Sequence, residues 1–295
     1  MASGEKRKVA SDENTLDLVG IGSMVLDRMH RTRRVLGKNE KGLLENVGEQ
    51  DEAGPAGPVQ LCTGGVMLTQ FGWAALFGLR VGLFGRQADD DAGRRLRLAM
   101  KRVGIETHLD LSGSASSLAE IFVDADGERA IYMAAGATAE TTPEHVTRDH
   151  AEFIARGGLL STEVSQLPLD TTLAALRFAH ESGLSTALDL DILPSDAIAS
   201  LGDRETLEKV LGEADLLKPT ALAARELFPE IEDLEEVVEA LRAKTGARVV
   251  VLTDGERGSL LCDAEGTRWV AAYPISGVVD STGAGDAFFG GFLAG

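Results

Sequence analysis

Helical and extended segments alternate along most of this chain, and the alternation limits the folds that it can adopt. From Gly64 onward, stretches with the apolar period of a helix are followed by short apolar runs that end in turn residues. The expected helices are 66–79, 90–105, 168–183, 204–214 and 233–246, and the expected strands are 79–86, 158–162, 184–191, 215–219 and 248–255. Alternation of this kind is typical of parallel β-α units, so the sequence predicts an α/β fold.

Three other regions depart from this alternation. The segment Leu16–Asp27 reads as one buried strand that leaves through glycines, with Asp27 at its carboxyl end. Residues 28–59 are charged and contain GPAGP, which indicates irregular structure or short exposed strands. Residues 117–135 read as a β-hairpin around Asp126-Gly127, and a second hairpin is expected at 263–266.

Composition excludes several classes of protein. The formal net charge of −18 disfavours a nucleic-acid or anionic-membrane surface, because phosphate-rich partners would be repelled. Two separated cysteines, Cys62 and Cys262, indicate neither a disulfide framework nor a zinc site. Since the N-terminus lacks the apolar core of a signal peptide and no long apolar run occurs, we expect a cytoplasmic protein without a membrane span.

The segment 279–286, VDSTGAGD, places flexible glycines between hydroxyl groups and two carboxylates. Its glycines open a helix whose first N–H groups have no partner within the helix and suit a phosphate or a developing oxyanion. Gly283 and Gly285 let the backbone approach such a group closely. Asp286 beside this site fits a base that activates a hydroxyl for attack on a phosphate, although an aspartate that only caps the helix has the same pattern. No GxxxxGK[ST] loop occurs, so any phosphoryl transfer here is not of the P-loop type.

This segment resembles the second signature of the ribokinase-like (PfkB) carbohydrate kinase family, DTxGAGD, with Ser281 in place of the usual threonine. Other positions follow in the same order along the chain. Gly64-Gly65 before a helix and VGLFGRQADDDAGRRL resemble the first signature, with Ala88 where a glycine is common. RVVVLTDGERGSLL and GERAIYMAAGATAETTPEHV resemble the nucleotide-side turn and the lid strand of ribokinases. The resemblance spans about residues 16–295.

The resemblance implies a three-layer α/β sandwich with a mostly parallel central sheet and a small β lid. The kinase domain would cover 14–295, with lid segments at about 28–62 and 117–135 and a disordered tail at 1–13. Exposed lid strands often pair in this family, so the resemblance makes a homodimer through these strands one candidate assembly and leaves the oligomeric state open. Relatives continue for further helices past the FFGGFLAG segment, so we expect a C-terminally truncated form with exposed apolar surface.

By the same resemblance, residues can be given roles on the sugar side. Asp27, Gly64 and Gly65 match positions that hold sugar hydroxyls, and Glu163 matches an acid near the sugar and phosphates. A strand-end turn for Asp27 and a solvated loop acid for Glu163 are the alternatives. Asp189 and Asp191 in ALDLDILPS look like the D-x-N/D element of sugar-acid kinases, but turn formers at a strand end have the same pattern.

On the phosphate side, Gly283, Ala284 and Gly285 match the anion hole and Asp286 matches the catalytic base. Thr253, Gly255 and Gly258 would border ATP. Asp280 and Thr282 match a loop that binds a monovalent cation such as K+ in many members. The implied cofactors are ATP and Mg2+, with K+ as a further candidate.

Several positions depart from the family's pattern. The NxxE element that organises water around Mg2+ should follow DLLKP, but Thr220 and Ala223 stand there, and Glu226 lies about one helical turn further on. The ribokinase asparagines after GG and within GAN are Thr69 and Thr138, which lack an amide's paired donor and acceptor. Ribose itself is therefore in doubt as the substrate.

The resemblance as a whole implies ATP-dependent phosphorylation of a primary hydroxyl on a small sugar or sugar acid. A nucleoside kinase of the adenosine type has the same fold, although 5% aromatic residues offer little to stack on a base. A catalytically weak, sugar-binding regulatory relative would explain the missing NxxE residues. Turnover of ATP against a panel of sugars and nucleosides separates these alternatives.

Overall fold

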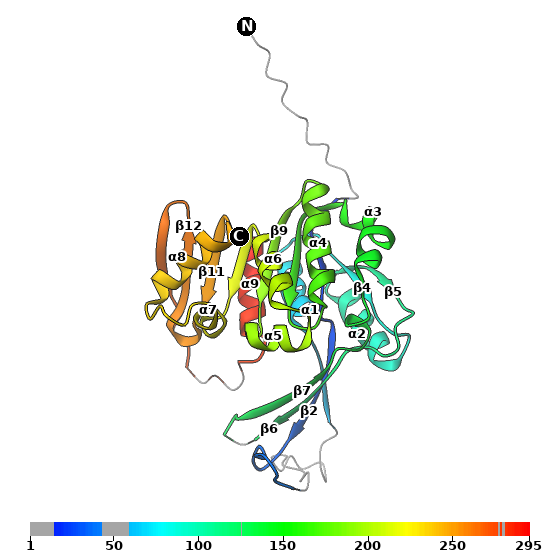
Figure 1. Ribbon diagram of the computed structural model, residues 1–295. Helices are drawn as coiled ribbons and strands as arrows, with labels where there is room; N and C mark the ends of the chain where they lie inside the picture. Colours follow the sequence, from blue (N-terminus) through cyan, green and yellow to red (C-terminus); the bar gives the residue numbers. More distant parts are fainter. Residues whose placement is uncertain (1–14, 43–58, 125, 277, 279–280) are drawn as a thin grey trace.

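The protein folds into three layers around a nine-stranded sheet, as a computed structural model shows (Figure 1). The structure describes residues 15–42, 59–124, 126–276, 278 and 281–295. In spatial order the strands are β13 (Gly266–Ala271), β12 (Gly258–Asp263), β11 (Val249–Thr253), β10 (Leu216–Pro219), β9 (Ser185–Leu190), β8 (Gly157–Val164), β1 (Leu16–Ile21), β4 (Val81–Arg86) and β5 (Glu106–Asp110). Pairings from β11 to β5 are parallel, and β12 and β13 are antiparallel. The predicted α/β fold with a mostly parallel sheet is confirmed.

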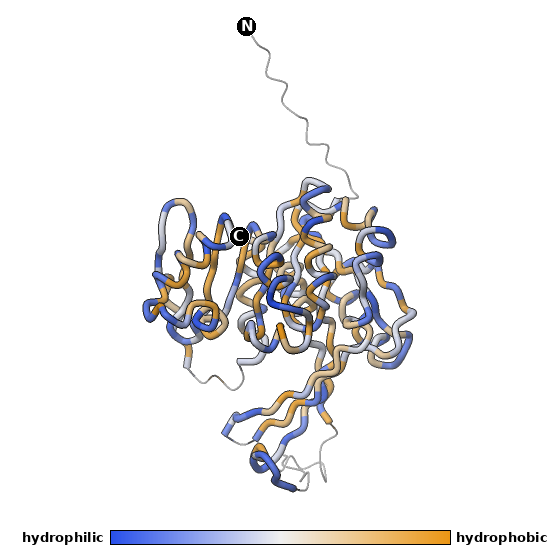
Figure 2. Tube along the Cα trace, in the orientation of Figure 1, coloured by the Kyte–Doolittle hydropathy of each residue, from blue (hydrophilic) through white to orange (hydrophobic). Residues whose placement is uncertain are grey.

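Helices cover both faces of this sheet and form two main cores. One face carries α1 (Val66–Leu76), α2 (Asp91–Arg102) and α9 (Ala284–Ala294). The other carries α3 (Ala151–Ile154), α4 (Leu169–Glu181), α5 (Pro194–Ser200), α6 (Arg204–Gly212), α7 (Ala221–Leu227) and α8 (Leu234–Thr245). Single turns lie at η1 (Gly136–Thr138), η2 (His145–Asp149) and η3 (Gly255–Arg257). Figure 2 shows hydrophobic residues running through the interior of the sandwich, where both cores lie.

Two glycines fix the position of α9. A methyl group on Gly20 in β1 would lie 2.4 Å from Cζ of Phe71, so only glycine lets α1 pack this closely on the sheet. A methyl group on Gly290 in α9 would lie 2.3 Å from the backbone oxygen of Gln70. Since α9 therefore packs directly on the backbone of α1, its N-terminus is held at the edge where the parallel strands end. No helix among the described residues is both long and apolar enough to span a bilayer.

A second sheet of four strands projects from the sandwich as a lid (Figure 1). Its strand order is β3 (Gln60–Gly64), β2 (Val25–Arg31), β6 (Leu118–Val123) and β7 (Arg129–Ala134). The hairpins β6–β7 and β12–β13 are antiparallel, as predicted.

The prediction of one strand over residues 16–27 was wrong. β1 ends at Ile21, and Asp27 lies within β2, where it pairs with Cys62 of β3. The break has a physical cause, because the backbone N–H and the hydroxyl of Ser23 both donate to the buried carboxylate of Glu163. These bonds replace a sheet ladder at Ser23, and the chain leaves the large sheet for the lid. Strand β5 was not predicted, and the lid segment 28–62 is described only at 28–42 and 59–62.

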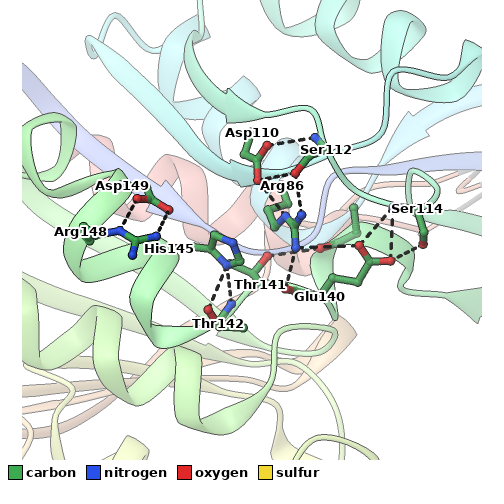
Figure 3. Close-up of polar contacts among 11 residues, drawn as sticks. Arg86, Asp110, Ser112, Ser114, Glu140, Thr141, Thr142, His145, Arg148 and Asp149 are labelled. Atoms are coloured by element: carbon green, nitrogen blue, oxygen red, sulfur yellow. Dashed lines mark hydrogen bonds and ion pairs between the residues drawn. The ribbon is translucent and has the colours of Figure 1, made fainter.

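A network of polar side chains holds both ends of the lid hairpin against the large sheet (Figure 3). We call it the lid-root cluster: Arg86, Asp110, Ser112, Ser114 and Glu140. Nη2 of Arg86 donates to the Ser112 hydroxyl over 2.7 Å, and its Nε lies 2.9 Å from Oδ2 of Asp110. Nη1 of Arg86 donates to the Glu140 carbonyl over 3.1 Å, and the Ser114 hydroxyl donates to the Glu140 carboxylate. Chain segments before β6 and after β7 are thus tied to the carboxyl ends of β4 and β5.

Candidate active site

A cavity of about 340 Å³ lies between the lid and the carboxyl ends of the parallel strands. The lid contributes Asp27 from β2 and Arg129 from β7, and β6 and β7 add apolar side chains. The sheet contributes Asp191, Lys218 and Thr253, which follow or end β9, β10 and β11. The turn before α9 and the first turn of this helix close the remaining side with Ser281, Thr282, Gly283, Gly285 and Asp286. Segments far apart in the sequence therefore meet at the place where binding sites of open α/β sheets are found.

The N-terminus of α9 faces this cavity. Gly283 is the N-cap with φ 74°, a left-handed conformation that favours glycine, and Asp286 lies in the first helical turn. The Ala284 amide donates to the carbonyl of Ser281 over 3.1 Å and so helps to form the turn itself. Unpartnered N–H groups and the positive end of the helix dipole make such a turn attractive to an anion.

Asp286 is the carboxylate at this helix end. Burial raises its pKa to about 8, and the negative charges of Asp189 and Asp191 add to the increase while Lys218 opposes it. A carboxylate with a raised pKa is a stronger base than an ordinary aspartate, which suits proton removal from a hydroxyl.

Asp27 faces the same cavity from the lid. Its Oδ2 would lie 2.2 Å from a methyl group on Gly64, so the glycine makes room for the carboxylate. Gly65 is the N-cap of α1 with φ 92°. Burial raises the pKa of Asp27 to about 6. The structure thus brings Asp27, Gly64 and Gly65 together at the N-terminus of α1, and their sugar-binding role stays a prediction.

Glu163 is an interior residue that contacts the lining of the cavity through Ser23. It is fully buried in β8, so the solvated-loop alternative was wrong. Its carboxylate accepts from the Ser23 amide over 2.6 Å and from the Ser23 hydroxyl over 2.9 Å. The Ser23 oxygen in turn accepts from the amide of Val66 over 2.9 Å. Glu163 therefore positions Ser23, which lines the cavity, and the start of α1.

The residues predicted to border ATP lie together at the turn between β11 and β12. Thr253 ends β11 and lines the cavity. Gly255 and Gly258 have φ 53° and 113°, and a methyl group on Gly258 would lie 2.1 Å from the backbone oxygen of Val270. These glycines shape the turn that places Thr253, and open space lies beside Gly255.

The two acids of ALDLDILPS separate into different roles. Asp191 lines the cavity. Asp189 is fully buried, and its carboxylate contacts Nζ of Lys218 at 2.9 and 3.0 Å and accepts from Nε2 of Gln70 over 2.7 Å. Asp189 is therefore an interior partner of a lysine and not a turn former.

The residues at the NxxE positions do not fit a Mg2+ ion organised there. The Thr220 hydroxyl caps α7 by accepting from the amide of Ala223, and Ala223 is buried. The Glu226 carboxylate accepts from the amide of Ser195 over 2.6 Å, so it is already engaged. Among the described residues no cluster of three or more His, Cys, Asp or Glu could hold a metal ion.

The proposed K+ loop is only partly described. Asp280 lies outside the described residues. Arg129 of the lid donates to the hydroxyl of Thr282. A guanidinium in contact with this oxygen would repel a cation bound to it, so the geometry at Thr282 does not fit K+.

Sequence reasoning missed Lys218, Gln70, Arg129 and Ser23. Lys218 has the clearest sequence signal of a buried polar contact. A lone lysine inside the apolar strand DLLKP must either reach solvent or pair with a buried group of opposite charge. Gln70 is likewise a polar residue on the apolar side of α1. His180 lies at the end of α4 beside Glu213 and Asp215.

Several known proteins are similar to this chain in sequence and in fold. The chain is 31% identical over 235 residues to the ATP-dependent ribose-1-phosphate kinase of Halopiger xanaduensis, covering 75% of this chain and 69% of that protein. It is 24% identical over 258 residues to the ribokinase of Arabidopsis thaliana, covering 84% of this chain and 65% of the relative. The chain therefore spans just under two thirds of the length of that relative.

Solved structures of kinases have a similar fold. The adenosine kinase of Sinorhizobium meliloti superposes with a TM-score of 0.76 at 26% identity, covering 95% of this chain and 87% of that one. Arabidopsis thaliana ribokinase, solved with ribose and ATP, gives a TM-score of 0.74 at 20% identity, covering 95% and 85%. The pfkB carbohydrate kinase family matches residues 25–295. With the acid at the amide-rich end of α9 and the lid over its cavity, the chain belongs to the pfkB family of carbohydrate kinases.

Proposed function

We propose that the protein transfers the terminal phosphoryl group of ATP to a primary hydroxyl of a small sugar or sugar acid. The observation that carries this proposal is the position of Asp286, a carboxylate with a raised pKa at the N-terminus of α9 inside a lid-covered cavity. The family assignment adds the reaction class.

Each wall of the cavity has a part in this reaction. Asp27 and the turn at Gly64 and Gly65 hold sugar hydroxyls, because one carboxylate can accept from two neighbouring hydroxyl groups. Asp286 takes the proton of the attacking hydroxyl. The amides around Gly283 and Gly285 face the charge on the transferred group. The turn that holds Thr253 borders the nucleotide.

The lining also bears on the choice of substrate. No Phe, Tyr or Trp is among the described residues that line the cavity, so a nucleobase finds no stacking partner there. Arg129 offers a cation to an acidic or phosphorylated sugar. The 5-dehydro-2-deoxygluconokinase of Listeria monocytogenes, a relative with 27% identity over 228 residues, supports the sugar-acid class. We therefore favour a sugar or sugar acid over a nucleoside.

A panel assay tests the proposal. ADP formation is followed with neutral sugars, sugar acids, sugar phosphates and nucleosides, and each product is identified by the chemical shift of its phosphorus nucleus. We expect turnover with a sugar or sugar acid and a phosphate ester at a primary carbon. Turnover confined to nucleosides would favour the second candidate, and sugar binding without turnover would favour a regulatory relative.

Pairing through the lid is proposed as the assembly mode. The edge strand β7 exposes Tyr132, with 68% of its surface accessible, between Ile131 and Met133, which also line the cavity. Exposed apolar edge strands pair readily with a second chain. A homodimer by light scattering that becomes a monomer on Tyr132→Lys would support this mode, and a wild-type monomer would exclude it.

A further inference from the structure

An ion pair is buried directly beneath the first turn of α9. The side chains of Lys218 and Asp189 are 1% and 0% exposed, and Nζ of Lys218 lies 2.9 and 3.0 Å from the two carboxylate oxygens. Gln70 of α1 donates to Oδ2 of Asp189 over 2.7 Å, which fixes the carboxylate from the other side. Three elements, α1, β9 and β10, therefore hold one ammonium group in one place.

This ammonium group points to the candidate anion hole. A methyl group on Gly285 would lie 3.3 Å from Nζ of Lys218, so the nitrogen is next to the backbone that opens α9. Lys218 also lines the cavity together with Asp286 and Asp191. One side of the lysine is thus neutralised by Asp189, and the other faces the place where a phosphoryl group would lie.

The negative charges in the cavity must be offset by a cationic group if a nucleotide is to bind there. Three carboxylates, from Asp27, Asp191 and Asp286, face the cavity and would repel the phosphates of a nucleotide. The side chains at positions 220 and 223 offer no carboxylate to organise a divalent cation. The cationic side chains that line the cavity in the described residues are Arg129 on the lid and Lys218 on the rigid sheet.

A buried ion pair is also a costly way to stabilise a fold, since well-packed apolar residues often do as well or better. Because this pair lies beside the N-terminus of α9, we expect its role to be in the reaction and not in the stability of the fold. We propose that Lys218 is a catalytic residue that contacts the transferred phosphoryl group, and that Asp189 is the positioning residue that holds it there. This inference rests on the proposed function.

The chemical step follows with its charges balanced. The sugar oxygen forms a bond to the terminal phosphorus while the bond from that phosphorus to the bridging oxygen breaks, and the electron pair leaves with ADP. The hydroxyl proton goes to Asp286. Lys218 keeps its proton throughout and faces the negative charge on the phosphoryl oxygens, as the amides at Gly283 and Gly285 do.

Turnover of a paired set of variants tests the proposal. Lys218→Met should lower kcat by about 10²–10³-fold, the usual effect of removing one preorganised donor. This variant leaves Asp189 buried without its ion-pair partner and could unfold, so the double variant Lys218→Met with Asp189→Asn is the decisive one. It removes both charges and keeps an amide oxygen for Gln70. We expect it to fold and to retain the loss in kcat, whereas recovery to within threefold of the wild type would show that the pair is only structural.

The pH dependence of kcat/KM gives a readout that a structural role would not move. Asp27, Asp189, Asp191 and Lys218 act on the pKa of Asp286, and Arg129 faces the same cavity. Loss of the Lys218 charge should move the acid limb of the profile to higher pH, and loss of the Asp189 charge should move it to lower pH. Both single variants break the same ion pair, so equal shifts or none would overturn the proposal.

Nucleotide binding separates this inference from the proposed function. By calorimetry with ATP and ADP and no sugar, the wild-type chain should prefer ATP, and the double variant should lose this preference. Equal affinity of the wild type for both nucleotides would overturn the role of Lys218. Turnover retained by Asp286→Asn would instead overturn the proposed base and leave the nucleotide result unaffected. Lys209→Met, which breaks the exposed Lys209–Glu205 pair in α6, is the matched control and should change neither readout.

Discussion

Two clusters of charged residues lie at the carboxyl edge of the large sheet, and they have opposite electrostatic properties. In the lid-root cluster, burial would raise the pKa of Asp110, but hydrogen bonds from Ser112 and the charge of Arg86 outweigh it and lower the pKa. In the cavity, burial and neighbouring carboxylates raise the pKa of Asp286 to about 8. The first cluster stabilises ionised carboxylates, and the second destabilises them. The Asp110 carboxylate at the base of the lid is therefore kept ionised, while the Asp286 carboxylate in the cavity is kept reactive.

The strongest test of this comparison is to neutralise one acid in each cluster. Asp286→Asn should lower kcat by about 10²–10⁴-fold, the usual contribution of a positioned general base, with little change in sugar affinity. Asp110→Asn removes an acid of the same type at the same sheet edge and should keep turnover within about threefold. Steady-state kinetics on both variants measure the two effects. If Asp286→Asn kept most of its turnover, the two acids would not differ in their importance for catalysis.

The pH profile of the wild-type enzyme should show the raised pKa directly. A base must be ionised to act, so kcat/KM should rise about tenfold per pH unit below about pH 8 and level off above it. An ordinary aspartate would give a profile that is flat from about pH 5 upward. Rates measured from pH 5 to 9.5 at constant ionic strength distinguish the two, and a flat profile would mean that Asp286 does not act as the base in this environment.

Restoring the family's NxxE residues should have a smaller effect. Thr220→Asn with Ala223→Glu would add a carboxylate that can organise the water shell of Mg2+, so the Mg2+ concentration for half-maximal rate should fall severalfold. The double variant Thr220→Asn with Ala223→Gln is the control, because glutamine has the size of glutamate without its charge. An unchanged Mg2+ requirement in the carboxylate variant would show that the ion is organised without these positions.

The sequence predicted the parts of the molecule that depend on local pattern. Alternating periodicity located most elements of the large sheet, and the glycines of VDSTGAGD located the turn at Gly283 and its acid. Glycine at position 283 is favoured by its left-handed backbone, with φ 74°, which is why the signal is visible in one sequence.

Side chains whose role depends on a distant partner were not predictable in this way. The solvated-loop alternative for Glu163 stayed open because nothing near it in the sequence shows that Ser23, 140 residues away, donates to it twice. The Lys218–Asp189 pair depends on the register of β9 and β10, in which these two residues lie side by side. Asp27 was assigned to the wrong strand because apolar periodicity does not show where a chain leaves one sheet for another.

The last expected effect concerns stability, and its sign should differ between the two clusters. The folded-state pKa of Asp286 is raised above the unfolded value, so ionisation costs stability progressively as pH rises from about 4 to 8. Asp286→Asn removes this cost and should be more stable than the wild type at pH 8, by up to about 1.4 kcal/mol for each unit of pKa shift realised. The pKa of Asp110 is lowered, so its charge stabilises the fold above the unfolded pKa and this contribution is lost in acid. Asp110→Asn should therefore lower the free energy of unfolding at pH 8 by about 0.5–1 kcal/mol, the usual contribution of a partly exposed pair.

Thermal melts at pH 8 and below pH 4 measure both signs, because the Asp286→Asn difference should vanish in acid, where the wild-type carboxyl is protonated in both states. A lower melting temperature for Asp286→Asn at pH 8 would mean that the folded protein stabilises the ionised carboxylate, and the two clusters would then be alike.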